Sequence, residues 1–265
     1  MIVLSRSLVL SPTSAVNLSA PVILWDSIAD VASITASSED DAYPASNLAT
    51  ESTIEVWKAE ATGEVTIEVN TGGQIIDAVG FARSNFGTAG AMIMVEALID
   101  AVWVEVIEEF IPADNSPLLM RFEPANVTTL RVTITSPTVV ASAAVMFVGK
   151  LLVFPHGISA GHVPLDHARE TQVVNGTSEA GNFLGRIVTG QSAQTSAQFN
   201  NLPADWFYDE MSEFVQRGAS GAFFFAWLPK SRPQSVGYSW LTADPQPNEG
   251  SIYVDVVLNY GGMVR

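Results

Sequence analysis

Three histidines and a carboxylate provide the first candidate for metal chemistry. His156, His162 and His167 lie in one short stretch of the sequence, and Asp166 precedes the last of them. Imidazole and carboxylate groups suit zinc or nickel. Their spacing matches no standard ligand pattern, and the two prolines and two glycines at residues 155–164 are typical of a connector. The sequence therefore favours an exposed connector over a metal site.

Carboxylates form two further clusters. Glu39, Asp40 and Asp41 are consecutive, and oxygen ligands crowded in one loop could bind calcium. No EF-hand pattern accompanies them, so a solvated loop is the simpler interpretation. The second cluster could be interpreted as the acid–base pair of a glycoside hydrolase, but the exposed face of an amphipathic helix also explains it. Its members are Asp205, Asp209, Glu210 and Glu213.

No pattern in the sequence supports a catalytic nucleophile. The chain has no cysteine, which excludes thiol nucleophiles, disulfides and thiolate metal sites. It contains no G-x-S-x-G elbow, no phosphate-binding loop, no dinucleotide-binding glycine pattern and no H-E-x-x-H motif. We therefore expect no enzymatic activity and no cofactor, with calcium as the only alternative.

One loop combines an aromatic side chain with polar side chains and is the candidate glycan site. Phe86 follows Arg83 and Asn85 at the end of an expected strand. Polar groups on a loop can bind sugar hydroxyls while an aromatic ring packs on the sugar. The remaining aromatics of this half are expected in the core, because most strand aromatics are buried. They include Trp25, Trp57, Phe81 and Trp103.

Composition narrows the classes of partner. The chain has 265 residues, a net charge of −16 and 15% charged residues. Lys and Arg drive binding to nucleic-acid backbones, and their scarcity argues against specific nucleic-acid binding. No apolar run approaches the ~20 residues of a membrane span, and residues 1–10 resemble a first strand more than a signal peptide. We expect a protein made in a cytoplasm, without membrane insertion, and the low charged fraction suggests surface hidden in an assembly.

Alternating hydrophobic patterns predict a mainly β fold. Residues 64–69, 101–107 and 130–135 alternate strictly between apolar and polar side chains. A helical pattern occurs at about 203–217, where Phe207, Met211, Phe214 and Val215 share one face. We predict a jelly-roll β-sandwich at 1–154, a connector at 155–168, and a β-sandwich or barrel with one flanking amphipathic helix at 169–265.

Two segments of the first half resemble discoidin-like (galactose-binding-like) jelly-roll domains. They are YPASNL at residues 43–48, followed by WKA at 57–59, and IIDAVGFARSN at 75–85. The resemblance covers roughly residues 30–150 and implies a jelly roll whose loops could bind a sugar. Some domains of this kind carry calcium in the general region of Glu39, Asp40 and Asp41.

The end of the chain is similar to phage tail tube, distal-tail and hub proteins, in which a β-sandwich with one helix forms rings around the tail lumen. The similarity involves residues 219–230, 232–240 and 254–262. It implies a structural virion protein of a phage tail or baseplate, present as a homo-oligomeric ring in contact with other tail proteins. The alternative is a carbohydrate-binding, lectin-like protein that recognises a cell-surface glycan through its N-terminal domain.

Overall fold

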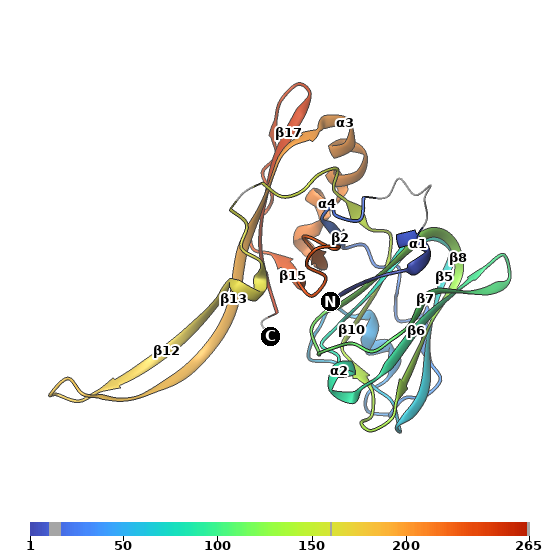
Figure 1. The fold of residues 1–265 in the computed structure, drawn as a ribbon, viewed down its shortest axis with the longest axis horizontal. Helices are drawn as coiled ribbons and strands as arrows, with labels where there is room; N and C mark the ends of the chain where they lie inside the picture. Colours follow the sequence, from blue (N-terminus) through green and yellow to red (C-terminus); the bar gives the residue numbers. More distant parts are fainter. Residues whose placement is uncertain (11–16, 160, 264–265) are drawn as a thin grey trace. The chain divides into compact units, whose positions relative to one another are not determined.

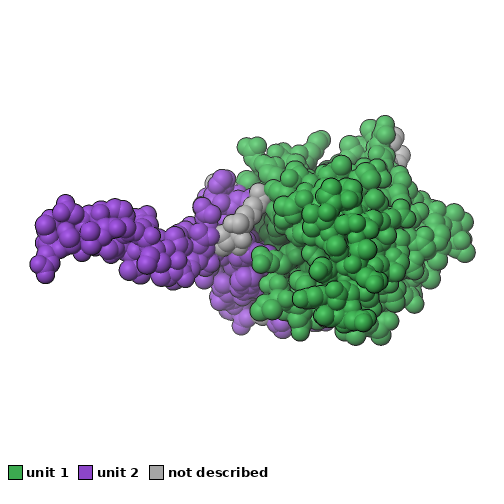
Figure 2. Space-filling view, turned by 90° about the horizontal axis from the view of Figure 1, so that it is seen from below, with its two compact units in different colours: residues 1–157, 221–238 green, residues 158–220, 239–265 purple. Residues whose placement is uncertain are grey.

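The computed structural model describes residues 1–10, 17–159 and 161–263, and it is mainly β as the sequence predicts. The chain divides into two compact units (Figure 2). Unit 1 comprises Met1–Gly157 with Gly221–Tyr238, and unit 2 comprises Ile158–Ser220 with Ser239–Arg265. Within the described residues, no helix is long and apolar enough to cross a membrane.

A seven-stranded sheet forms much of unit 1 (Figure 1). The expected alternation is confirmed: Val65, Ile67 and Val69 are buried, whereas Glu64 is exposed, because successive side chains of a strand face opposite ways. β1 joins β8 in parallel, and the other pairings of this sheet are antiparallel among the described residues. In spatial order, five of its strands are β10 (Val145–Gly149), β5 (Gly63–Ala82), β8 (Leu118–Ser136), β6 (Met92–Ile99) and β7 (Val102–Phe110). The other two are β1 (Ile2–Leu4), which pairs with β8, and β3 (Ile34–Ala36), which pairs with β5.

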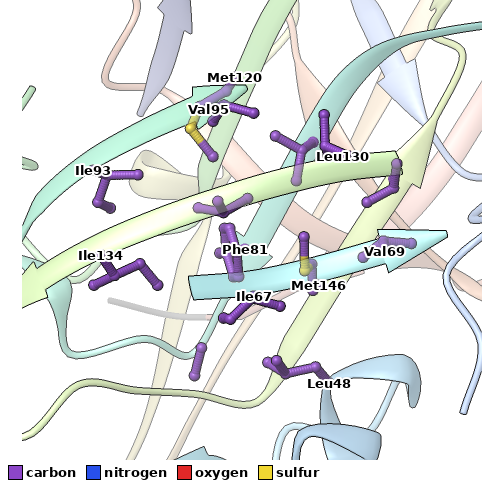
Figure 3. Packing of buried hydrophobic residues seen from close by; sticks show 14 of the residues in the cluster. Leu48, Ile67, Val69, Phe81, Ile93, Val95, Met120, Leu130, Ile134 and Met146 are labelled. Carbon is purple, nitrogen blue, oxygen red and sulfur yellow. The ribbon is translucent and has the colours of Figure 1, made fainter. Parts of the chain in front are cut away.

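The hydrophobic core of unit 1 lies against one face of this sheet. Phe81, Ile67 and Met146 belong to the same buried cluster as Leu48 (Figure 3). Trp57 is fully buried, as expected for a strand aromatic, and its indole N–H donates to the Ser38 carbonyl at 3.3 Å. The short elements around this core are η1 (Ala45–Ala49), β4 (Trp57–Lys58), α2 (Phe86–Ala89) and β9 (Ser142–Ala143).

A second apolar layer involves the segment Gly221–Tyr238. The ring of Phe224 packs closely on Gly80: a Cβ added to Gly80 would lie 2.9 Å from that ring. Phe147 packs edge-on against the Phe224 ring, with 5.5 Å between the two ring centroids. The strands of this layer are β2 (Val22–Leu24), β14 (Ala222–Ala226) and β11 (Leu152–Val153).

The C-terminal domain expected at 169–265 is therefore not contiguous. Residues 221–238 belong to unit 1 because β14 pairs with β2, and because Tyr238 donates its hydroxyl hydrogen to the Glu51 carbonyl at 2.9 Å. The Glu51 carboxylate also accepts the Ala222 N–H at 2.8 Å. The division therefore follows from strand pairing between segments that are distant in the sequence. The composition of the sequence predicts no domain boundary at residues 221 and 238.

Gly149 provides a test of the packing in unit 1. A Cβ at this position would lie 2.3 Å from the Asp26 carbonyl oxygen. Gly149→Ala should therefore lower the free energy of unfolding by about 1–3 kcal/mol, the usual cost of overpacking. The matched control is Gly157→Ala, where a Cβ would have no heavy atom within 4 Å. Urea denaturation of both variants measures the difference, and equal midpoints would contradict the packing.

Unit 2 contains a sheet and the predicted helix. Helical structure runs through residues 204–217 as expected, with one π-helical turn, and it buries Phe207, Met211 and Phe214. The helical elements are η2 (Leu165–His167), α3 (Ala204–Trp206), η3 (Phe207–Met211), α4 (Ser212–Arg217) and η4 (Gly218–Ser220). The strands are β12 (Arg169–Thr177), β13 (Phe183–Pro203), β17 (Tyr253–Gly262), β16 (Asn248–Glu249) and β15 (Val236–Leu241), which pairs with β17 through residues 239–241.

The N-terminal ten residues differ from expectation. The first strand ends at Leu4, and Arg6–Leu10 forms the short helix α1. Leu8 is buried, and the Ser5 N–H donates to the Arg121 carbonyl at 2.8 Å. Packing against distant residues thus overrides the local alternation that predicted one continuous strand.

Candidate functional site

The most exposed feature of unit 2 is a long β-hairpin, here called the arm and defined as residues 169–192 (Figure 1). β12 pairs with β13 from Arg169↔Ala193 to Thr177↔Phe183. β13 pairs with β17 only from Ala193 onward. Within the described part of the chain, the arm is therefore a two-stranded ribbon with no strand on either outer edge.

The arm carries large apolar side chains without a core. None of its residues is buried. Val174, Phe183, Leu184, Ile187 and Val188 are 53–70% exposed. An isolated two-stranded hairpin is marginally stable in water, and natural edge strands usually carry charges or prolines that prevent pairing. The arm has the composition of an interaction surface. From the sequence, residues 170–178 and 183–188 are predicted to be strands, and the structure has strands there, but the sequence gives no sign that they lack a core.

The proposed glycan loop has one clearly exposed member. Arg83 is exposed and has a positive φ of 54°. Phe86 is buried and packs edge-to-face on Phe81 at 5.4 Å, so its ring is not at the surface. The Asn85 side chain bonds its loop to residues 140–142: its Nδ2 donates to the Val140 carbonyl at 2.8 Å, and its Oδ1 accepts the Ser142 N–H at 2.9 Å.

The structure brings this loop close to the other segment of the resemblance. The Lys58 N–H donates to the Tyr43 carbonyl at 3.2 Å, and Lys58 pairs with Ser142. The Asn85 N–H in turn donates to the Ser142 carbonyl at 3.1 Å. Tyr43 is 40% exposed, and the Lys58 Nζ lies 5.8 Å from the centroid of its ring. An exposed ring, an ammonium group and the Arg83 loop are thus linked by consecutive backbone contacts.

The roles of Arg83 and Asn85 can be separated by stability. Asn85→Ala should lower the free energy of unfolding by about 1–3 kcal/mol, because it leaves a backbone N–H and a carbonyl without a partner. Arg83→Ala should change it by no more than about 0.5 kcal/mol, as exposed substitutions do. Thermal unfolding of both variants measures this. If Asn85→Ala unfolds as the wild type does, its side chain has no structural role and becomes available for a ligand.

The acidic cluster forms local hydrogen bonds. The Glu39 carboxylate accepts the Ala45 N–H at 2.6 Å, and the Asp40 carboxylate accepts the Ala42 N–H at 3.0 Å. Asp41 is exposed. Among the described residues, no group of three or more His, Asp or Glu side chains is placed to hold a metal ion. The loop therefore orders the start of η1, and calcium binding here stays a prediction.

The histidines lie in separate surroundings. His156 Nδ1 is 3.0 Å from the Gly157 carbonyl oxygen, and His162 Nδ1 is 2.9 Å from that of Ser196. Burial lowers the pKa of His162 below its usual value. His167 ends the short helix η2, and Asp166 precedes it. Among the carboxylates of the 204–217 helix, Glu213 pairs with Arg217 at 2.6 Å, four residues along the same helix.

A buried pair of charges was not anticipated. Asp77 and Arg121 are 4% and 2% exposed. The Asp77 Oδ1 accepts the Leu151 N–H at 2.7 Å, and burial raises the pKa of Asp77 to about 6 despite the opposing charges of Arg121 and Lys150. Arg121 Nη1 has no hydrogen-bond partner among the described residues. One feature of the sequence could have indicated this pair: Asp77 and Arg121 are each the only charged residue in an apolar strand segment, at 75–79 and 118–122.

Comparisons with known proteins concern only part of the chain. No family model and no curated protein match it. Among solved structures, a family 32 carbohydrate-binding module of NanJ from C. perfringens, in complex with galactose, has 16% identity and a TM-score of 0.40. The match covers 48% of this chain and 98% of the module. Chitosan-binding module 1 from Paenibacillus sp. IK-5 has 21% identity and a TM-score of 0.39, over 46% of this chain and 98% of the module.

A larger protein, SpGH29, also matches, with 15% identity and a TM-score of 0.39. The match covers 46% of this chain and only 28% of SpGH29. Each of these three matches covers a little less than half of this chain, between 46% and 48%.

Proposed function

We propose that this chain is a structural protein that assembles with copies of itself and with other proteins in the tail or baseplate of a bacteriophage. The observation that supports assembly is the arm, whose apolar side chains and unpaired strand edges have no partner within the described chain. The similarity of residues 219–230, 232–240 and 254–262 to tail proteins supports the phage setting. The low charged fraction of 15% is consistent with surface hidden in an assembly.

The arm would contribute to assembly in two ways. Its outer edges present backbone N–H and C=O groups that another strand can pair with, as in β-strand addition. Its side chains would gain free energy when a neighbour removes them from water. In a closed ring, both outer edges of every arm would pair with a neighbouring copy. We therefore propose a ring as the form of the assembly.

Composition of purified particles tests the proposed function. Mass spectrometry of virions from the source should find this chain at a small fixed number per particle, about three or six for common ring symmetries. Ile187→Ser, which removes an apolar side chain of the arm, should reduce incorporation. Ile54→Ser makes the same change at an exposed position of unit 1 and should be incorporated normally. Absence of the wild-type chain from every particle would end the proposal.

Glycan recognition by unit 1 is the second proposed function. It is supported by the exposed Tyr43 ring, which lies beside Lys58 and is linked through Ser142 to the Arg83 loop. Aromatic rings with convergent polar groups are typical of small-molecule sites. Tyr43→Ala should abolish binding on an array of cell-surface glycans, whereas Tyr208→Ala, at an exposed tyrosine of unit 2, should not. If neither the wild type nor the variants bind any glycan, unit 1 has only a structural role.

A further inference from the structure

Apolar side chains occur on both faces of the arm. Val173 pairs with Val188, and Val174 pairs with Ile187. Directly opposed residues share a face, and successive residues point to opposite faces. One face therefore carries Val173 and Val188, and the other carries Val174 and Ile187. A ribbon with one face in water would show polar residues on that face, so this pattern indicates that both faces are covered.

The charge of the arm permits a second copy of this chain as the partner. The arm contains two basic residues, Arg169 and Arg186, and two acidic residues, Glu170 and Glu179, so its net charge is zero. The whole chain has a net charge of −16, all of which therefore lies outside the arm. Two copies repel each other through the rest of their surfaces, and the neutral arm can approach a like-charged neighbour at the lowest electrostatic cost.

Unit 2 also offers a surface that could receive the arm. Tyr253 and Val257, with Asp255 between them, lie on the face of β17 opposite the buried Val254, Val256 and Leu258. Trp240 pairs with Gly261 on the same face, and its Nε1 would be 3.3 Å from a Cβ at that glycine. Tyr253, Val257 and Trp240 are 37–50% exposed. We call these three residues the aromatic strip.

We propose that the arm of one copy is buried on both faces by other copies of this chain, with one face lying on the aromatic strip of a second copy. This inference rests on the proposed assembly function and specifies its partner and its geometry. It differs from pairing through strand edges alone, which would leave at least one face of the arm in water.

The chain has no cysteine, so a cysteine introduced by mutation is its only reactive thiol. The rate at which that thiol is labelled therefore reports whether its position is buried. Single variants Val174→Cys and Val188→Cys probe the two faces of the arm, and Val257→Cys probes the aromatic strip. Ile54→Cys is the exposed control in unit 1. Each full-length variant is examined by sedimentation velocity at about 1–100 µM, and its rate of maleimide labelling is measured at both ends of this range.

We expect self-association at high concentration. Labelling of the two arm thiols and the strip thiol should then slow by about tenfold or more, with no change at position 54. Continued labelling of either arm thiol in the associated state would overturn burial on both faces. Continued labelling of the strip thiol would overturn the receiving surface. A chain that stays monomeric throughout would overturn the second copy as the partner. None of these results decides whether the protein is a tail component, because particle composition tests that separately.

Discussion

Trp57→Ala is expected to lower the free energy of unfolding of unit 1 by about 3–5 kcal/mol, the range for truncating a buried large aromatic side chain. Trp57 is fully buried, and its indole N–H donates to the Ser38 carbonyl. The substitution removes the ring, leaves a cavity beneath β4 and leaves that carbonyl without its donor. Since domains are stable by only about 5–15 kcal/mol, a substantial fraction of the stability of unit 1 would be lost.

Chemical denaturation followed by circular dichroism measures this change. Ile54→Ala is the control, because Ile54 is 88% exposed in the same unit and should change the free energy of unfolding by no more than about 0.5 kcal/mol. Trp57→Phe should give an intermediate loss, because it keeps most of the apolar volume but loses the hydrogen bond. A loss at Trp57 no greater than that at Ile54 would contradict the buried position.

Asp77→Asn is expected to stabilise the protein at pH 7 by up to about 3 kcal/mol, with no difference from the wild type below about pH 3. Burial is the main reason that the pKa of Asp77 is raised from 3.8 to about 6. The neutral amide imitates the protonated carboxyl, and its oxygen can still accept the Leu151 N–H. The substitution therefore removes the cost of a buried negative charge.

The direction of the pH dependence follows from proton binding. The folded state holds the Asp77 proton more tightly than the unfolded state, so this group makes the protein more stable as the pH falls from above 6 to below 3.8. The difference between wild type and Asp77→Asn should close across that window in urea titrations at several pH values. If Asp77→Asn is less stable than the wild type at pH 7, attraction to Arg121 outweighs burial and the predicted sign is wrong.

Asp30→Asn provides a control of opposite sign. Hydrogen bonds from the backbone and side chain of Ser33 and from the backbone of Ala32 lower the pKa of Asp30, whose carboxylate is exposed. Its ionised form therefore stabilises the folded state above the unfolded pKa, and this stabilisation is lost as the pH falls. Asp30→Asn should destabilise the protein near pH 7, and its difference from the wild type should shrink in acid.

Assembly and glycan recognition make separate demands on the chain. The proposed assembly involves residues 169–192 and exposed residues of unit 2, whereas the proposed glycan binding involves Tyr43, Lys58 and Arg83 in unit 1. Variants of one set can therefore be tested without disturbing the other. A phage tail protein that also contacts its host would use both.

The sequence by itself determined the kinds of elements and many of their bounds. The alternation at 64–69 and the apolar face of residues 204–217 depend on neighbouring residues, and the structure confirms both. The segments around Tyr43 and Ile75 predicted a jelly roll in the first half, and the structure has a seven-stranded sheet there. These features were readable because strand and helix periods are local properties of a chain.

Only the tertiary structure decided which side chains remain available. Phe86 is a surface candidate in the sequence, but it packs on Phe81 in the core. Asn85 is committed to Ser142, which lies 57 positions away, and Asp77 to Leu151, 74 positions away. The arm reads as two ordinary strands, yet no other part of the described chain covers it. Burial and hydrogen bonding depend on segments brought together by folding, and no local pattern of residues records which distant partner will arrive.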